Sequence, residues 1–178
     1  MRFEGEMTTI RRYLALIVFV VLVTGCDRRQ PTPCAEVIAD RDFGSFELAL
    51  GGLARDLDSR LEWFRCSVGQ RFNGSKCIGE PKIERWEDAV ALISEINEKS
   101  GTDWRLPTLK ELKSITLSQC GNPAVNTNVF VDIMVENYWA SDESPHIGFR
   151  CGMYTFSGAT SCRLFDNLER PFLMVRKF

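Results

Sequence analysis

The side chains of this chain that could do chemistry are carboxylates, arginines, cysteines and a single histidine, His146. A serine or cysteine hydrolase needs a histidine base, and His146 lies in "SDESPHIG", a segment typical of an exposed turn. A hydrolase with two catalytic carboxylates would need one distinct pair, and the sequence singles out none. The residues therefore favour a protein that is not an enzyme.

Other polar residues could bind a ligand without catalysis. They lie in residues 118–137 and 141–165, which carry many polar residues, and loops on a rigid scaffold often carry binding sites. Amide and carboxylate oxygens are ligands of Ca²⁺, although an acidic run is more often a solvated turn. The calcium candidates are Asn137, Asp142 and Glu143. Side chains that could bind a sugar or an anionic polymer, by hydrogen bonds and stacking, are Arg150, Tyr154 and Arg163.

The first 25 residues have the features of a secretory signal. Arg11 and Arg12 precede the apolar run Leu14–Val23, which is shorter than the roughly 20 residues of a membrane-spanning helix. Small residues lead to Cys26, so the segment resembles a bacterial lipobox with cleavage before Cys26 and lipid attached to it. The alternative is an ordinary signal peptide with an incidental cysteine, and translation could also begin at Met7.

The net charge of the chain after the signal limits its partners, and its length indicates how many domains it forms. The 178 residues include 22 basic and 24 acidic ones; three basic and two acidic residues precede Cys26, which leaves 19 and 22. This net negative charge argues against nucleic acid as a partner. We expect a polar tether over residues 26–33 and a single domain over 34–178. In enteric-type bacteria, Asp27 after the lipidated cysteine implies retention in the inner membrane, facing the periplasm.

Six cysteines follow Cys26, and an even number in an exported chain predicts three disulfides. Cys66 and Cys77 flank a segment with the turn signal Asn73-Gly74, which predicts that these two pair. The other four cysteines allow three pairings. The pairing that we favour is Cys34–Cys120 with Cys151–Cys162. A metal site of cysteines and histidines would need them closely spaced, so none is expected, and Ca²⁺ is the one cofactor that the sequence leaves open.

The periodicity of apolar residues predicts the elements that must position these groups. From Trp86 to Lys99, apolar residues recur at the helical i, i+3, i+4 and i+7 spacing, and a second helix begins near Leu109. Leu53 and Leu61–Cys66 predict strands around a turn, and residues 118–137 predict an irregular loop. Further short strands follow in "NYWAS", "IGFRCGMYTFSG", "TSCRLF" and "FLMVRKF". This order predicts an α+β fold, with two helices packed on a small antiparallel sheet.

The segment "GTDWRLPTLKELKSI" predicts a structural hub between the two helices. Proline disfavours helical geometry in the residue before it, and T-x-x-E is a capping box that opens a helix. We expect a buried tryptophan and leucine, an arginine within a structural polar network, and a threonine and glutamate that cap the second helix. The residues of this hub are Trp104, Arg105, Leu106, Pro107, Thr108 and Glu111.

Six segments, in this order, resemble a bacterial family of domains of unknown function, typified by the C-terminal domain of a collagen-like adhesin. They are "LEWFRCSVGQRFNGSKC", "WEDAVALISEIN", "DWRLPTLKEL", "NPAVNTNVF", "YWAS" and "MVRKF". The resemblance covers about residues 52–178. It implies a relationship to C-type lectin-like folds and to the formylglycine-generating enzymes, with the N- and C-terminal strands brought together.

The resemblance implies surface recognition, with glycans as the ligand class. The lectin calcium motifs E-P-N and W-N-D are missing, and Cys151 and Cys162 lack the short spacing of the reactive cysteines of formylglycine-generating enzymes. We therefore expect a disulfide-bonded, C-type lectin-like α+β domain, anchored to the membrane by lipid, that binds a glycan or an anionic polysaccharide. A periplasmic protein partner is the alternative, and it would need an exposed apolar patch.

Overall fold

The computed structural model describes residues 30–144, 146–164 and 167–178. The expected signal peptide, Met7, Cys26 and Asp27 lie outside the described residues. The segment Pro31–Phe178 forms one unit, which begins three residues before the expected boundary at Cys34. In the described ranges, no helix is long and apolar enough to cross a membrane.

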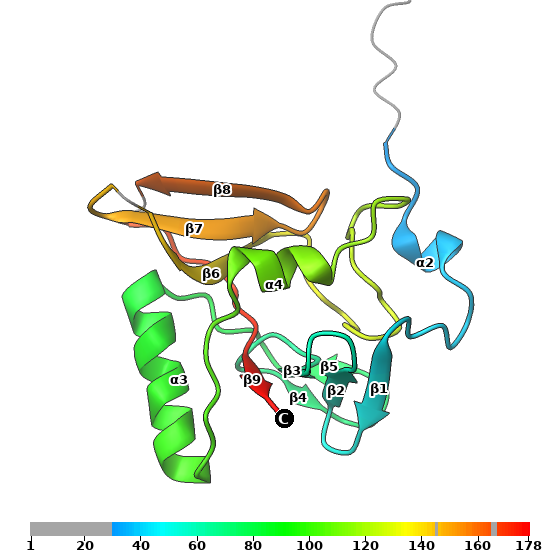
Figure 1. Ribbon diagram of the computed structural model, residues 1–178, viewed down its shortest axis with the longest axis horizontal. Coiled ribbons are helices and arrows are strands. Elements are labelled where there is room, and N and C mark those ends of the chain that lie inside the picture. The colour runs from blue at the N-terminus through cyan, green and yellow to red at the C-terminus, as the bar shows by residue number, and fades with distance from the viewer. Residues whose placement is uncertain (1–29, 145, 165–166) are drawn as a thin grey trace, which may run out of the picture. The chain divides into compact units, whose positions relative to one another are not determined.

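In the part of the chain that the structure describes, two antiparallel sheets and a two-stranded ribbon, rather than one small sheet, make up the β structure (Figure 1). The first sheet has the strand order β1-β2-β3-β9, with bounds Phe46–Ala49, Leu53–Asp56, Leu61–Phe64 and Val175–Lys177. The second sheet has the order β6-β7-β8, with bounds Asn137–Glu143, Phe149–Tyr154 and Ala159–Leu164. The ribbon pairs β4 with β5, with bounds Arg71–Phe72 and Cys77–Ile78.

The expectation that the N- and C-terminal strands come together is confirmed, and the C-terminal strand β9 lies in a different sheet from β6, β7 and β8. β9 pairs with β3, so that Trp63 lies opposite Val175. The physical reason is partly electrostatic, because Glu62 on β3 is buried and accepts a 2.7 Å hydrogen bond from Nε of Arg176 on β9. Burial raises the pKa of Glu62, but hydrogen bonds from Arg176 and Arg55 outweigh it and hold that pKa below its ordinary value. A buried carboxylate needs such partners, and the C-terminal strand β9 supplies Arg176 as one of them.

The described residues contain three helices: α2 at Cys34–Val37, α3 at Trp86–Ser100 and α4 at Leu109–Ser114. Helix α3 ends at Gly101, whose φ of 65° is the left-handed conformation that glycine adopts without strain. The short α4 contacts β6 and β7, and Figure 1 shows it beside the second sheet. Residues 118–136 contain no helix or strand, as expected of an irregular loop.

Two clusters of buried side chains form the core. The larger one lies around Trp63, Phe130 and Tyr138, and the indole of Trp63 meets the Phe130 ring edge-on at 5.7 Å. The smaller cluster joins Trp104 and Trp139 to the inner face of α3. The irregular loop therefore contributes to the core through Phe130, although it has no regular backbone hydrogen bonding.

The structure contains three disulfides, and each is one of the pairs that the sequence favoured. They are Cys34–Cys120, Cys66–Cys77 and Cys151–Cys162. The first ties the N-terminal helix to the irregular loop across 86 residues, and the other two link neighbouring strands or strand ends. The candidate ligand residues lie in the strands β6, β7 and β8 rather than in loops, and the Cys151–Cys162 disulfide cross-links β7 to β8.

Candidate functional site

The hub residues connect both helices to the first sheet. Thr108 accepts a 3.1 Å hydrogen bond from the backbone N–H of Glu111, and the Glu111 carboxylate accepts a 2.7 Å bond from the N–H of Thr108. The predicted capping box is therefore present. Arg105 exchanges two backbone hydrogen bonds with Val175 of β9, and the carbonyl of Pro107 accepts one from Ser141 of β6. One extended segment thus joins the two sheets and opens α4.

The side chains of the hub are held as firmly as its backbone. Trp104 and Leu106 are buried. The amide of Asn97 on α3 accepts from the N–H of Trp104 at 2.8 Å and donates to its carbonyl at 2.7 Å. The guanidinium of Arg105 donates to both carboxylate oxygens of Glu111, at 2.8 and 2.7 Å. These contacts give Arg105 and Glu111 structural partners, and Trp104 and Leu106 pack in the smaller core cluster.

The Glu111 carboxylate makes the stability of the hub depend on pH. Burial raises its pKa, but hydrogen bonds from Arg105 and from the backbone of Thr108 outweigh burial, so the pKa lies below the ordinary 4.5. A depressed carboxyl pKa contributes stability above the ordinary pKa, and the contribution is lost as the pH falls through the folded-state value.

We therefore expect Glu111→Gln to lower the free energy of unfolding by about 1–2 kcal/mol at pH 7, a value reduced for the partial exposure of Arg105. The difference from the natural chain should shrink as the pH falls below 4.5. Urea unfolding at a series of pH values measures both effects. A difference that stays constant from pH 7 to pH 3 would show that the charge of Glu111 does not stabilise the hub.

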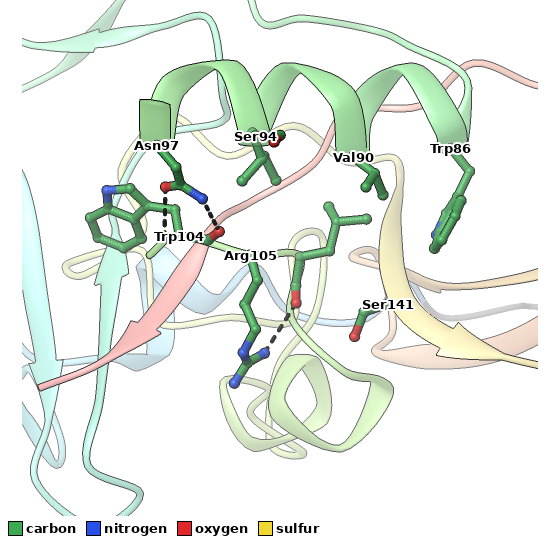
Figure 2. Close-up of a pocket in the computed structure, with 9 residues that line it drawn as sticks. Trp86, Val90, Ser94, Asn97, Trp104, Arg105 and Ser141 are labelled. Carbon is green, nitrogen blue, oxygen red and sulfur yellow. Dashed lines mark hydrogen bonds between the residues drawn. The ribbon is translucent and has the colours of Figure 1, made fainter. Parts of the chain in front are cut away.

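A mainly apolar pocket of about 310 Å³ lies between the hub and α3; we call it the tryptophan pocket. In Figure 2, Val90 and Ser94 lie on α3 at one side of the pocket, and Arg105 and Ser141 lie on the opposite side. The Trp86 ring at one end has the Arg150 guanidinium 4.4 Å from its centre. The charge of Arg105 is balanced by Glu111 and that of Arg150 by Glu87. The tryptophan pocket therefore presents no unbalanced charge to a ligand.

Three of the six predicted ligand residues come together in a second pocket, of about 330 Å³, on the β6-β7-β8 sheet. Asn137 of β6, Tyr154 of β7 and Arg163 of β8 line it, and Arg170, which the sequence analysis missed, lines it too. The other lining residues are Ala159, Thr160 and Ser161. We call this the arginine pocket.

Two guanidinium groups, those of Arg163 and Arg170, line the arginine pocket. Burial lowers the pKa of Arg170, and the neighbouring charge of Arg163 lowers it further, while Glu136 raises it. The Arg170 guanidinium also lies 4.8 Å from the centre of the Trp139 ring. Tyr154 is 37% exposed and stacks on Phe156 at 5.7 Å. Hydroxyl groups, an amide, an aromatic ring and two cations are the groups that hold a polyhydroxylated anion.

The other three predicted ligand residues lie elsewhere. The Asp142 carboxylate accepts a hydrogen bond from the backbone N–H of Leu109 at the start of α4. Glu143 and Arg150 face each other across β6 and β7, and Arg150 donates to Glu87 at 2.6 Å. Among residues 30–144, 146–164 and 167–178, no three His, Cys, Asp or Glu side chains gather closely enough to hold a metal ion. His146 is exposed and its ring lies 5.2 Å from that of Phe149.

A third pocket, of about 660 Å³, lies near the N-terminal segment and has Arg65 in its wall; we call it the Arg65 pocket. No sequence pattern pointed to it, because its walls come from four separated parts of the chain. The only indication in the sequence was that Arg65, in the predicted strand Leu61–Cys66, lies between the apolar residues Phe64 and Cys66.

Comparison with models of known protein families matches residues 52–174 to the Lcl C-terminal domain. No curated protein and no solved structure matches the chain. The matched residues include β2, β3, both longer helices, the hub and the whole β6-β7-β8 sheet. Because the match covers more than half of its residues, the chain belongs to the Lcl C-terminal domain family.

Proposed function

We propose that this chain is a non-catalytic binding module of an exported lipoprotein, and that it recognises an anionic polysaccharide through the arginine pocket. The observation that carries the proposal is the meeting of Asn137, Tyr154, Arg163 and Arg170 in one pocket. Each of the three strands of the second sheet contributes a side chain to this pocket. A rigid sheet that presents polar and aromatic groups together is the arrangement that carbohydrate recognition requires.

Other parts of the proposal concern fold and location. A C-type lectin-like architecture is supported by the pairing of β3 with β9 and by the long irregular segment before β6. We propose lipidation at Cys26 and, because Asp27 follows, an inner-membrane anchor facing the periplasm. This location limits the polysaccharides that the domain meets to those that enter or are made in the envelope. We also propose that this domain is related to the C-terminal domain of the collagen-like adhesin that it resembles.

A glycan and glycosaminoglycan binding screen on oxidised residues 27–178 tests the proposal, with calcium and with chelator in parallel. We expect Arg163→Glu to weaken binding of the anionic polymers roughly tenfold, because it reverses a charge within the pocket. Binding should also fall with added salt, since exposed charges are screened.

The matched control is Lys177→Glu, which makes the same charge change on the exposed end of β9. Equal losses for Arg163→Glu and Lys177→Glu would assign binding to net charge and contradict the proposed pocket. Binding that chelator abolishes would instead favour a calcium site that includes Asn137, Asp142 or Glu143.

The second candidate function is recognition of a periplasmic protein through β8. Within the described residues β8 pairs only with β7, so its outer edge has no backbone partner. Leu164 at the end of β8 is 56% exposed, and Leu168 is 45% exposed. An open strand edge with apolar side chains favours an added strand from another protein. A negative glycan screen followed by specific capture of an envelope protein would favour this function. A formylglycine-generating-type enzyme is disfavoured, because Cys151 and Cys162 face each other in a disulfide.

A further inference from the structure

Arg65 is a buried cation without a carboxylate partner in the described part of the chain. The residue is 7% exposed. Its Nε donates to the carbonyl of Val129 at 2.7 Å, and its Nη2 donates to the carbonyl of Asn128 at 2.9 Å. None of the ion pairs between described residues includes it. The face of its guanidinium lies 4.6 Å from the centre of the Phe72 ring.

This burial of an unpaired guanidinium is energetically costly. Buried charges in proteins are normally paired, because moving an ion out of water carries a large penalty that only a countercharge offsets. Burial lowers the pKa of Arg65, and no acidic group raises it. Carbonyl oxygens and an aromatic face compensate only in part. Among the described residues, the positive charge of Arg65 is therefore not neutralised by a carboxylate.

The missing charge has room beside Arg65. The Arg65 pocket has a volume of about 660 Å³, within the ~300–1,000 Å³ range of ligand pockets. Its charged lining residues are Arg65, Arg41 and Asp40, which sum to one positive charge. Its polar lining includes Ser75, Thr127 and Asn128.

The walls of the Arg65 pocket are built in advance. The amide of Asn126 donates to the carbonyl of Asp42 at 3.0 Å, and the amide of Asn128 donates to the carbonyl of Ala39 at 2.9 Å. These bonds fix the segment that carries Asp40 and Arg41 against the irregular loop. Arg41 has a φ of 61°, a conformation that costs energy for a residue other than glycine. A wall with this strain is held in place by its surroundings rather than by local preference.

We infer that the Arg65 pocket binds the carboxylate of a small hydroxylated acid, with Arg65 as the buried countercharge and Arg41 at the rim. The single net positive charge matches a monoanion. A planar carboxylate suits the end of a guanidinium group whose Nε side already serves two carbonyls. The hydroxyl groups of Ser75 and Thr127 suit a ligand with hydroxyl groups. This site shares no residue with the arginine pocket and does not depend on the function proposed for it.

Calorimetric titration of the full chain in detergent with D-gluconate tests the inference. Sorbitol, which replaces the carboxylate by an alcohol, and inorganic sulfate are the comparison ligands. We expect saturable binding of gluconate, no heat from sorbitol, and a melting temperature that rises with gluconate concentration, because a ligand that binds only the folded state stabilises it. Absence of gluconate binding would overturn the inference, and sulfate binding of equal affinity would overturn the assignment to a carboxylate.

The variant Arg41→Glu tests where gluconate binds. Arg41 is exposed, so its replacement should leave the fold intact. Arg65 is not replaced, because it also donates hydrogen bonds to two carbonyls of the irregular loop. We expect Arg41→Glu to weaken gluconate binding about tenfold, which corresponds to ~1.4 kcal/mol. Lys110→Glu, the same charge change on the exposed face of α4, should leave it unchanged. Equal effects of the two variants would overturn the placement. Arg163→Glu should not alter gluconate binding, so failure of this site and failure of the arginine pocket are distinguishable.

Discussion

Trp104→Ala should lower the free energy of unfolding by about 3–5 kcal/mol, the usual cost of truncating a buried tryptophan. The side chain is 7% exposed and belongs to the smaller core cluster with Trp139 and Phe172. Its other face lies 4.4 Å from the Arg176 guanidinium of β9. Because a domain of this size is stable by only ~5–15 kcal/mol, the variant should be largely unfolded at moderate denaturant. Urea unfolding of the oxidised protein, followed by circular dichroism, measures the loss.

Trp86→Ala is the matched control, because it removes the same side chain from the other end of the tryptophan pocket. Trp86 is only partly buried, and its Nε1 donates to the carbonyl of Ala140 at 2.8 Å. We expect a clearly smaller destabilisation for Trp86→Ala than for Trp104→Ala. If Trp104→Ala stays as stable as the natural chain and loses only ligand binding, then Trp104 is a binding residue and the structural role assigned to the hub is wrong.

The features that could be predicted from sequence are those that local interactions determine. The capping box joins Thr108 to Glu111 within four residues, and the period of apolar residues sets α3 to within one residue of Trp86–Ser100. The Asn73-Gly74 turn brings Cys66 and Cys77 together for the same reason. Short-range geometry leaves few alternatives at these places.

The features that could not be predicted depend on pairing between distant segments. Strand propensity indicated β9, but only the family resemblance brought it to the N-terminal strands, because its partner β3 lies more than a hundred residues earlier and is chosen partly by the buried Glu62. The arginine pocket could be predicted only in part, since its residues from β6, β7 and β8 were suggested as ligands, whereas Arg170 follows after the sheet. The sequence around Arg65 gives no sign that this residue is buried, because its burial depends on contacts with the distant irregular loop.

Removal of the Cys34–Cys120 disulfide, as Cys34→Ser with Cys120→Ser, should cost about 4–5 kcal/mol. The bond closes a loop of 86 residues, and constraint of the unfolded chain grows with the logarithm of loop length. It also holds the N-terminal segment where the N–H of Cys34 donates to Gly121 at 3.2 Å and the N–H of Gly121 donates to Thr32 at 2.9 Å. Thermal and urea unfolding of the double variant measure the loss.

The Cys66→Ser, Cys77→Ser variant is the comparison, because that disulfide spans 11 residues and loop closure alone predicts about 3 kcal/mol. The two double variants differ little in the apolar atoms that they remove, so loop length is the main difference between them. A larger loss for the short loop would show that local packing of the β4-β5 ribbon outweighs loop closure. A larger loss of stability on removal of Cys34–Cys120 would show that the domain depends on this cross-link. The same disulfide ties α2 to the irregular loop. It therefore helps to keep the segment of Asp40 and Arg41, which forms a wall of the Arg65 pocket, against that loop.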